Sequence, residues 1–151
     1  MKSDLPDRTF KFATEIVKLY KYLHRQTDVP DVLQRQLLKA GTSIGANVHE
    51  GQSSQSQADF LTKYSIACKE SRETLYWLRL INATDDCLND RLDFLKEADE
   101  LTAILTAIII KVKVKKRVLK NLCKPQNSWC MDYFNHLTPM EVYSYGQKRT
   151  W

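Results

Sequence analysis

The sequence has four cysteines but no C-x-x-C pair, and their spacing does not match a zinc site. Free thiols in a reducing compartment are therefore expected. A long apolar run is also missing: the longest one, residues 103–110, is interrupted by Thr106 and followed by Lys111, so it is too short to span a bilayer. The first residues carry charges and a proline in place of the apolar run of a signal peptide, so export is not expected. These absences together favour a cytoplasmic protein without a membrane segment.

Residue patterns for catalysis or metal binding are equally scarce. Di-iron sites in helical bundles need a Glu-x-x-His pair on each of two helices. Here His49 precedes Glu50, and no second histidine falls in the later predicted helices. Ser43, Ser65 and Ser71 have no histidine at a helical spacing that would place a base beside them, and no glycine-rich phosphate loop follows a strand. We therefore expect no metal, no cofactor and no enzymatic activity.

Charge is unevenly distributed along the chain. Residues 1–110 contain 14 Lys and Arg against 16 Asp and Glu, whereas residues 111–151 contain 9 against 2. The net charge of +5 therefore comes from the C-terminal quarter, where residues 111–124 hold seven basic residues and no acid. Such a run is either a contact for the phosphates of RNA or DNA or a solvated face. The residues predicted to contact nucleic acid are Lys111, Lys113, Lys115, Lys116, Arg117 and Lys120.

Apolar residues recur at helical spacing in four segments, near residues 8–25, 31–51, 56–85 and 89–112. Ser56 is a candidate N-cap for the third segment. A chain of 151 residues is long enough for these helices to enclose one core. The residues predicted to face that core are Phe12, Ile16, Leu19 and Leu23 or Tyr20 in the first segment; Leu33, Leu37, Ala40, Ile44 and Val48 in the second; Phe60, Tyr64, Ala67 or Cys68, Ser71, Leu75 and Leu78 in the third; and Leu92, Leu95, Leu101, Ile104, Leu105, Ile108 and Val112 in the fourth.

Residues 42–51, TSIGANVHEG, are unusual for a helix surface. Glycine in a helix interior costs about 1 kcal/mol relative to alanine, so Gly41 and Gly45, four residues apart, indicate the close approach of another helix. Asn47 and Glu50 lie one turn apart at the edge of the apolar stripe and need partners if they are buried. The polar groups that we interpret as fixing helix register and subunit contact are Asn47, Glu50, Arg72, Glu73 and Arg79.

This segment resembles the SI-x-AN-x-x-EG signature of the four-helix bundle proteins of bacterial ribosomal RNA intervening sequences. The similarity continues through residues 56–61 and 65–80, and it covers about residues 8–113. The resemblance implies an all-α bundle but little about function, because members of this family mostly lack an assigned activity. Related proteins, the accessory variability determinants of diversity-generating retroelements, are pentamers that bind nucleic acid and a reverse transcriptase. The signature positions of this chain are Ser43, Ile44, Ala46, Asn47, Glu50, Gly51 and, in the next helix, Glu73.

The fourth predicted helix is apolar on most sides between Ala103 and Val112. A helix without a polar face is buried on all sides, and three other helices cannot cover it completely. Contact with a second copy of the chain is therefore expected. The family resemblance implies a ring of five copies.

The sequence thus predicts an all-α, up-down-up-down four-helix bundle in residues 1–122, followed by an irregular C-terminal extension in residues 123–151. We expect a non-enzymatic homo-oligomer, a pentamer as the family resemblance implies, that acts as a scaffold or accessory factor and contacts RNA or DNA through its basic run. The alternative is a protein–protein interaction module whose basic run only keeps the helix ends soluble. The resemblance adds a reverse transcriptase, or another protein, as a candidate partner.

Overall fold

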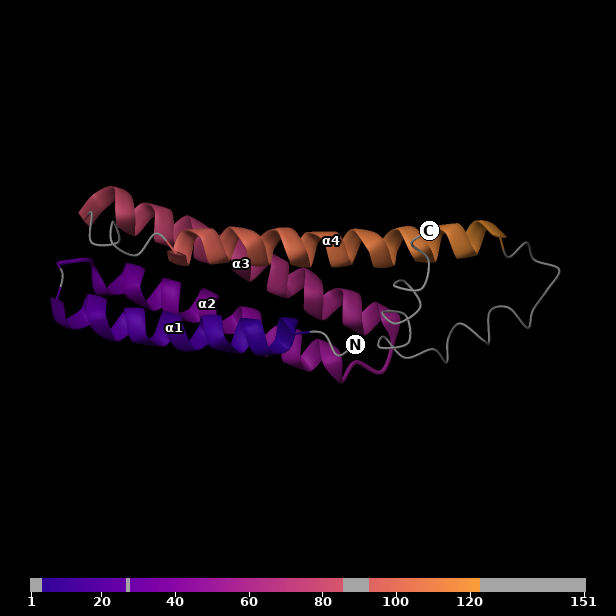
Figure 1. Ribbon diagram of the computed structural model, residues 1–151, viewed down its shortest axis with the longest axis horizontal. Coiled ribbons are helices and arrows are strands. Elements are labelled where there is room, and N and C mark those ends of the chain that lie inside the picture. Colours follow the sequence, from indigo (N-terminus) through magenta and orange to yellow (C-terminus); the bar gives the residue numbers. More distant parts are fainter. Residues whose placement is uncertain (1–3, 27, 86–92, 123–151) are drawn as a thin grey trace.

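The computed structural model describes residues 4–26, 28–85 and 93–122, and these residues form four α-helices without a strand among them. The helices alternate in direction and form two layers, with α1 and α2 side by side in one and α3 and α4 in the other (Figure 1). This arrangement confirms the predicted all-α, up-down-up-down four-helix bundle. The predicted extension, residues 123–151, lies outside the described residues. The four helices are α1 (Leu5–Gln26), α2 (Asp31–Gln52), α3 (Gln57–Asp85) and α4 (Asp93–Leu122).

The starts of three helices follow from local sequence signals. Helix α1 begins at Leu5, three residues before the predicted start, because Pro6 fits the first turn, where its missing N–H is not needed. Helix α2 begins directly after Pro30, whose carbonyl accepts a hydrogen bond from the N–H of Leu33 at 2.9 Å. Ser56 caps α3 as predicted, because its Oγ accepts a hydrogen bond from the N–H of Asp59 at 3.1 Å.

Helix α4 differs more from its predicted bounds. Its described part begins at Asp93, whereas the predicted start near residue 89 lies outside the described residues. At its other end it continues as a helix to Leu122 and extends beyond the ends of the other helices (Figure 1). No helix in the described ranges combines the length and the apolarity that crossing a bilayer requires.

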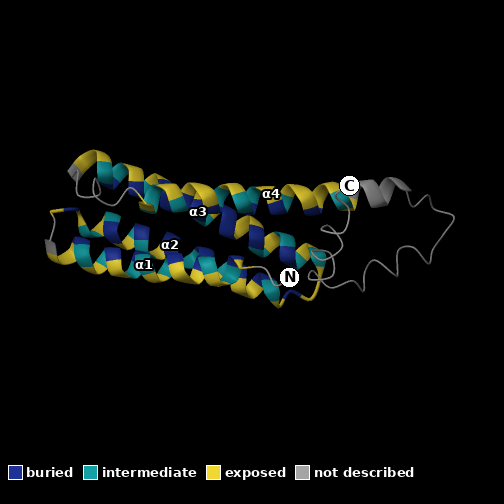
Figure 2. Cartoon of the chain, in the orientation of Figure 1, coloured by how far each residue is buried: buried dark blue, intermediate teal, exposed yellow. Residues whose placement is uncertain are grey.

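The predicted apolar stripes meet in one core that draws on all four helices. Figure 2 shows the buried residues along the facing sides of the helices and the exposed residues on their outer sides. Most of the predicted core residues are buried, and of the two alternatives in the first helix Leu23 is buried and Tyr20 half-buried. The exceptions are Leu33, Leu95 and Ile104, which are half-buried against the core, and Leu92, which lies outside the described residues.

The core also contains polar groups that the apolar spacing does not predict. Thr9 is fully buried, and its Oγ1 donates a hydrogen bond to the carbonyl of Pro6. The buried Gln34 donates from Nε2 to the carbonyl of Val29 at 2.7 Å. These hydrogen bonds offset the cost of removing the two donors from water.

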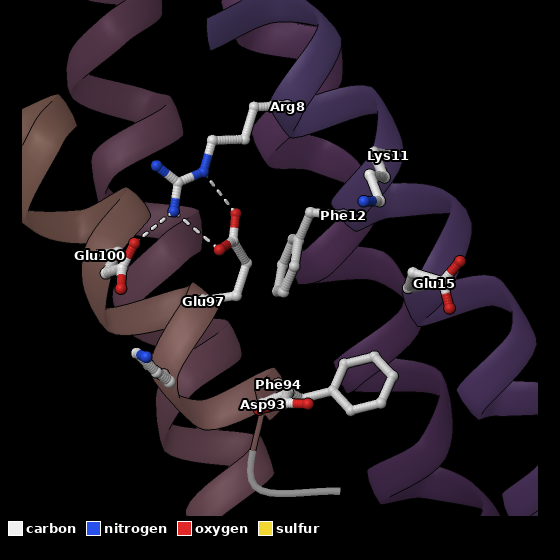
Figure 3. Close-up of a pocket in the computed structure, with 9 residues that line it drawn as sticks. Arg8, Lys11, Phe12, Glu15, Asp93, Phe94, Glu97 and Glu100 are labelled. Carbon is white, nitrogen blue, oxygen red and sulfur yellow. Dashed lines mark hydrogen bonds and ion pairs between the residues drawn. The ribbon is translucent and has the colours of Figure 1, made fainter.

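Helices that follow one another in the chain pack closely, whereas α1 and α4 are joined across a groove of about 610 Å³ by an ion-pair cluster. Arg8 of α1 donates from Nε and Nη2 to the two carboxylate oxygens of Glu97 at 2.6 and 2.7 Å, and Nη2 also contacts Glu100 at 2.5 Å (Figure 3). Phe12 and Phe94 lie beside this cluster on the same two helices. A bidentate pair of this kind has a defined distance and orientation, so Arg8 forms a specific link between α1 and α4.

Replacing Arg8 with glutamine is expected to lower the free energy of unfolding by about 1 kcal/mol at neutral pH, since the pair is partly exposed to solvent. Hydrogen bonds from Arg8 hold the pKa of the Glu97 carboxyl below its ordinary value of 4.5. The contribution of the Arg8–Glu97 pair to the free energy of unfolding is therefore complete above pH 4.5. It is lost as the pH falls through the lowered pKa of Glu97 in the folded state. Urea unfolding of wild type and Arg8→Gln at several pH values measures the difference.

The matched control for this prediction is Lys11→Gln, which removes a cation from the same groove that makes no ion pair with the described residues. Lys11 also lowers the pKa of Glu97, but its through-space attraction is the smallest of the causes, so the effect of Lys11→Gln on the free energy of unfolding should be much smaller than that of Arg8→Gln at every pH. An Arg8→Gln effect that stays constant between neutral and strongly acidic solution would show that Arg8 acts by packing and not through Glu97.

Candidate nucleic-acid interface

The glycines of the signature segment are explained by the packing of α2. A Cβ added at Gly41 would lie 2.8 Å from Cγ2 of Ile16, and one at Gly45 would lie 3.2 Å from the carbonyl oxygen of Thr9, so α1 crosses α2 at these two positions. A Cβ at Gly51 would lie 2.7 Å from Cε2 of Tyr64 in α3. The close helix approach predicted from Gly41 and Gly45 is confirmed, and its partner is α1.

The other signature residues have separate surroundings. Ile44 is fully buried, Ser43 is half-buried and Ala46 is exposed. Asn47 donates from Nδ2 to the carbonyl of Ser43 at 2.9 Å, one turn earlier in the same helix. The amide nitrogen of Asn47 is thus hydrogen-bonded within its own helix, and this bond does not join α2 to another helix.

The predicted polar group is not assembled within a single chain. Glu50 accepts a hydrogen bond from Nζ of Lys63 at 2.5 Å, which links α2 to α3 and raises the pKa of Lys63. Glu73 instead accepts a hydrogen bond from Nε1 of Trp77 at 3.2 Å. Arg72 and Arg79 are exposed on α3. A role of these residues in contact between subunits stays a prediction.

Metal ligands do not converge in the part of the chain that the structure describes. No group of three or more His, Cys, Asp or Glu side chains is placed there to hold a metal ion. His49 is exposed on α2, and its neighbour Glu50 is engaged with Lys63.

The six predicted nucleic-acid contacts all lie on the C-terminal part of α4, but they do not share one face. Lys111, Lys113 and Lys116 are exposed and Lys115 is half-buried, while the side chains of Arg117 and Lys120 lie outside the described residues. At 100° per residue, Lys113 and Lys116 lie on one side of the helix, and Lys111 and Lys115 lie on another. The four described lysines of the run therefore do not form one flat patch.

Two further basic residues, Lys69 and Arg72, which were not predicted to contact nucleic acid, lie beside Lys113 of this run. A groove of about 310 Å³ separates α3 from α4, and its basic lining residues are Lys69, Arg72 and Lys113. The remaining lining residues are apolar or carry a hydroxyl or thiol group, so none of them is acidic. At its floor, Sγ of Cys68 lies 3.3 Å from Oγ1 of Thr106. The signal that could have revealed these residues is the spacing of the exposed cations of α3.

Comparisons with known proteins show which family the bundle resembles. The family model of the 23S rRNA-intervening sequence protein matches residues 2–107. A crystal structure from Bacteroides thetaiotaomicron, described as a protein with unknown function from the S23 ribosomal protein family, is 39% identical with a TM-score of 0.66; the match covers 70% of this chain and 97% of that chain. No curated protein matches. With the family model over more than half of its length, and with the four helices and the signature glycines in place, the chain belongs to the 23S rRNA-intervening sequence protein family.

Proposed function

We propose that this protein is a non-enzymatic, homo-oligomeric scaffold or accessory factor that contacts nucleic acid through the basic C-terminal part of α4. The observation that carries the proposal is the charge asymmetry of this one helix. Its first turns hold the acidic residues Asp93, Glu97, Asp99 and Glu100, whereas every charged residue from Lys111 to the end of the helix is basic. A rigid helix thus presents many cations away from the acidic part of the bundle.

Stabilisation of the helix end does not by itself account for so many cations. Basic side chains near a helix C-terminus interact favourably with the helix dipole, but this effect is confined to the last turn. Lys111, Lys113, Lys115 and Lys116 lie more than one turn before Leu122. Repeated positive charge is what binding to a phosphate backbone requires, because each neutralised phosphate releases counterions.

The test is an anisotropy titration of a labelled oligonucleotide at two salt concentrations. With about six phosphate contacts, the affinity should fall by roughly three orders of magnitude between 50 and 200 mM salt and should depend little on base sequence. Replacing the six predicted contacts by glutamine should abolish most of the binding. In a ring, copies of the run from several subunits would reinforce one another.

The matched control removes the same number of exposed cations from α1 and α2, and these are Lys11, Lys18, Lys21, Arg25, Arg35 and Lys39. This control should bind nearly as wild type does, since those residues lie away from the basic run. Binding that survives neutralisation of the run, or that ignores salt, would contradict the proposal and favour the interaction module.

The second candidate, a protein–protein interaction module, is favoured by the outer face of α4. Ala103, Ala107, Ile110 and Val114 are all exposed and are spaced by four, three and four residues, which is the spacing of a seam against another helix. Ile110 and Val114 remain 55% and 54% exposed. The same stripe supports self-association of the chain. We propose that the homo-oligomer contains five copies and that a reverse transcriptase is a candidate partner, as the family resemblance implies.

A further inference from the structure

One exposed face of α3 carries positive charge over several turns. Ser65, Lys69, Arg72, Tyr76 and Arg79 are separated by four, three, four and three residues, so they follow one line along the helix. All five are exposed. We call this line the α3 face, and at 1.5 Å per residue it is about 21 Å long.

The cations of the α3 face lack acidic partners among the described residues. Lys69 and Arg72 line the groove between α3 and α4 together with Lys113, and no carboxylate belongs to that lining. None of the ion pairs between described residues involves these three side chains. The positive charge of the groove is therefore available to an anion.

Tyr76 adds an aromatic ring between Arg72 and Arg79. Its side chain is 57% exposed, and its ring meets the half-buried Trp77 edge to face, with centroids 4.9 Å apart. Trp77 is itself held by its hydrogen bond to Glu73. An exposed ring with a fixed support, flanked by cations, is the arrangement on which bases of single strands stack.

We propose that the α3 face and the adjoining groove bind single-stranded RNA or DNA, with phosphates on Lys69, Arg72 and Lys113 and a base stacked on Tyr76. An acidic peptide would also be attracted by the cations but would gain nothing comparable from the exposed ring. A duplex would present its phosphates but keep its bases stacked inside. The inference rests on the proposed function and extends it, because it names a second contact and the form of the nucleic acid.

The test compares a labelled oligo(dT) strand, a duplex of equal length and poly-glutamate, each titrated against the full chain. Tyr76→Ala should weaken oligo(dT) binding by roughly 5- to 150-fold while the salt dependence stays the same. Tyr76→Phe keeps the aromatic ring and should bind oligo(dT) as tightly as the wild-type protein does. Lys69→Gln with Arg72→Gln should instead weaken binding and lower the slope of the salt dependence by about 1.4, since two phosphate contacts to a single strand are lost.

The matched control is Lys21→Gln with Lys39→Gln, which removes two exposed cations from α1 and α2 and should leave binding unchanged. Equal affinity of Tyr76→Ala and wild type for oligo(dT), or a preference for duplex or poly-glutamate, would overturn the inference. Loss of binding on neutralising the α4 run, with no effect of the α3 variants, would overturn this inference and leave the proposed function intact. If oligo(dT) and duplex both fail to bind the wild-type protein, both proposals are wrong.

Discussion

Gly41→Leu is expected to destabilise the bundle by about 2 kcal/mol or more. The first added carbon alone would lie 2.8 Å from Cγ2 and 2.9 Å from Cγ1 of Ile16. Ile16 is fully buried and branched at Cβ, so it cannot swing away from the new side chain. Overpacking of this kind costs about 1 to 3 kcal/mol and sometimes more. The better helix propensity of leucine returns only about 1 kcal/mol.

Urea unfolding at a fixed protein concentration measures this effect, and Lys39→Leu serves as the control. Lys39 lies on the exposed side of the same helix, so an added leucine there meets no neighbour and should change the free energy of unfolding little. Gly45→Leu should also be destabilising, because its Cβ would approach the backbone of Thr9, which moves only if α1 moves. If Gly41→Leu unfolds at the same urea concentration as Lys39→Leu, α1 and α2 do not cross closely at Gly41.

The second large effect concerns assembly. Light scattering of the intact protein at micromolar concentration should give a multiple of 17.6 kDa, and for five copies a mass of about 88 kDa. Ile110→Lys should convert this assembly to monomers. The substitution removes an apolar side chain whose burial contributes about 1.5 to 3 kcal/mol and places a charge in every copy of the interface.

Val32→Lys is the control for assembly, because Val32 is an equally exposed apolar residue, 62% accessible, at the start of α2. It should leave the mass unchanged. A monomer mass for the wild-type protein would show that the exposed stripe of α4 does not mediate self-association. An oligomer that survives Ile110→Lys would place the interface elsewhere on the bundle.

The helices and the core could be predicted from the sequence because apolar spacing alone decides which side of a helix leaves water. The stripe of α1 is an example: Phe12, Ile16 and Leu19 were predicted to be buried and are buried. The buried Gln34 could not be predicted in this way. Its burial depends on the carbonyl of Val29, which only the turn between α1 and α2 brings within 2.7 Å.

The candidate interface was predictable only in part. The basic run of α4 is contiguous in the sequence, so its charge is visible there. Lys69 and Arg72 are far from Lys113 in the chain, and they share a groove only because α3 and α4 pack against each other in opposite directions. Sequence spacing reports neighbours within one helix, whereas neighbours on two helices are decided by how those helices pack.

By itself, the sequence determined the number of helices, their buried sides, the cap at Ser56 and the family signature, since these depend on residues within a few turns of one another. The tertiary structure decided which helix approaches Gly41, that Glu50 pairs with Lys63, and that Arg8 joins α1 to α4. Each of these contacts joins two helices. Their partners were therefore fixed by the packing of the whole core, in which many small contacts act together, and not by any local pattern.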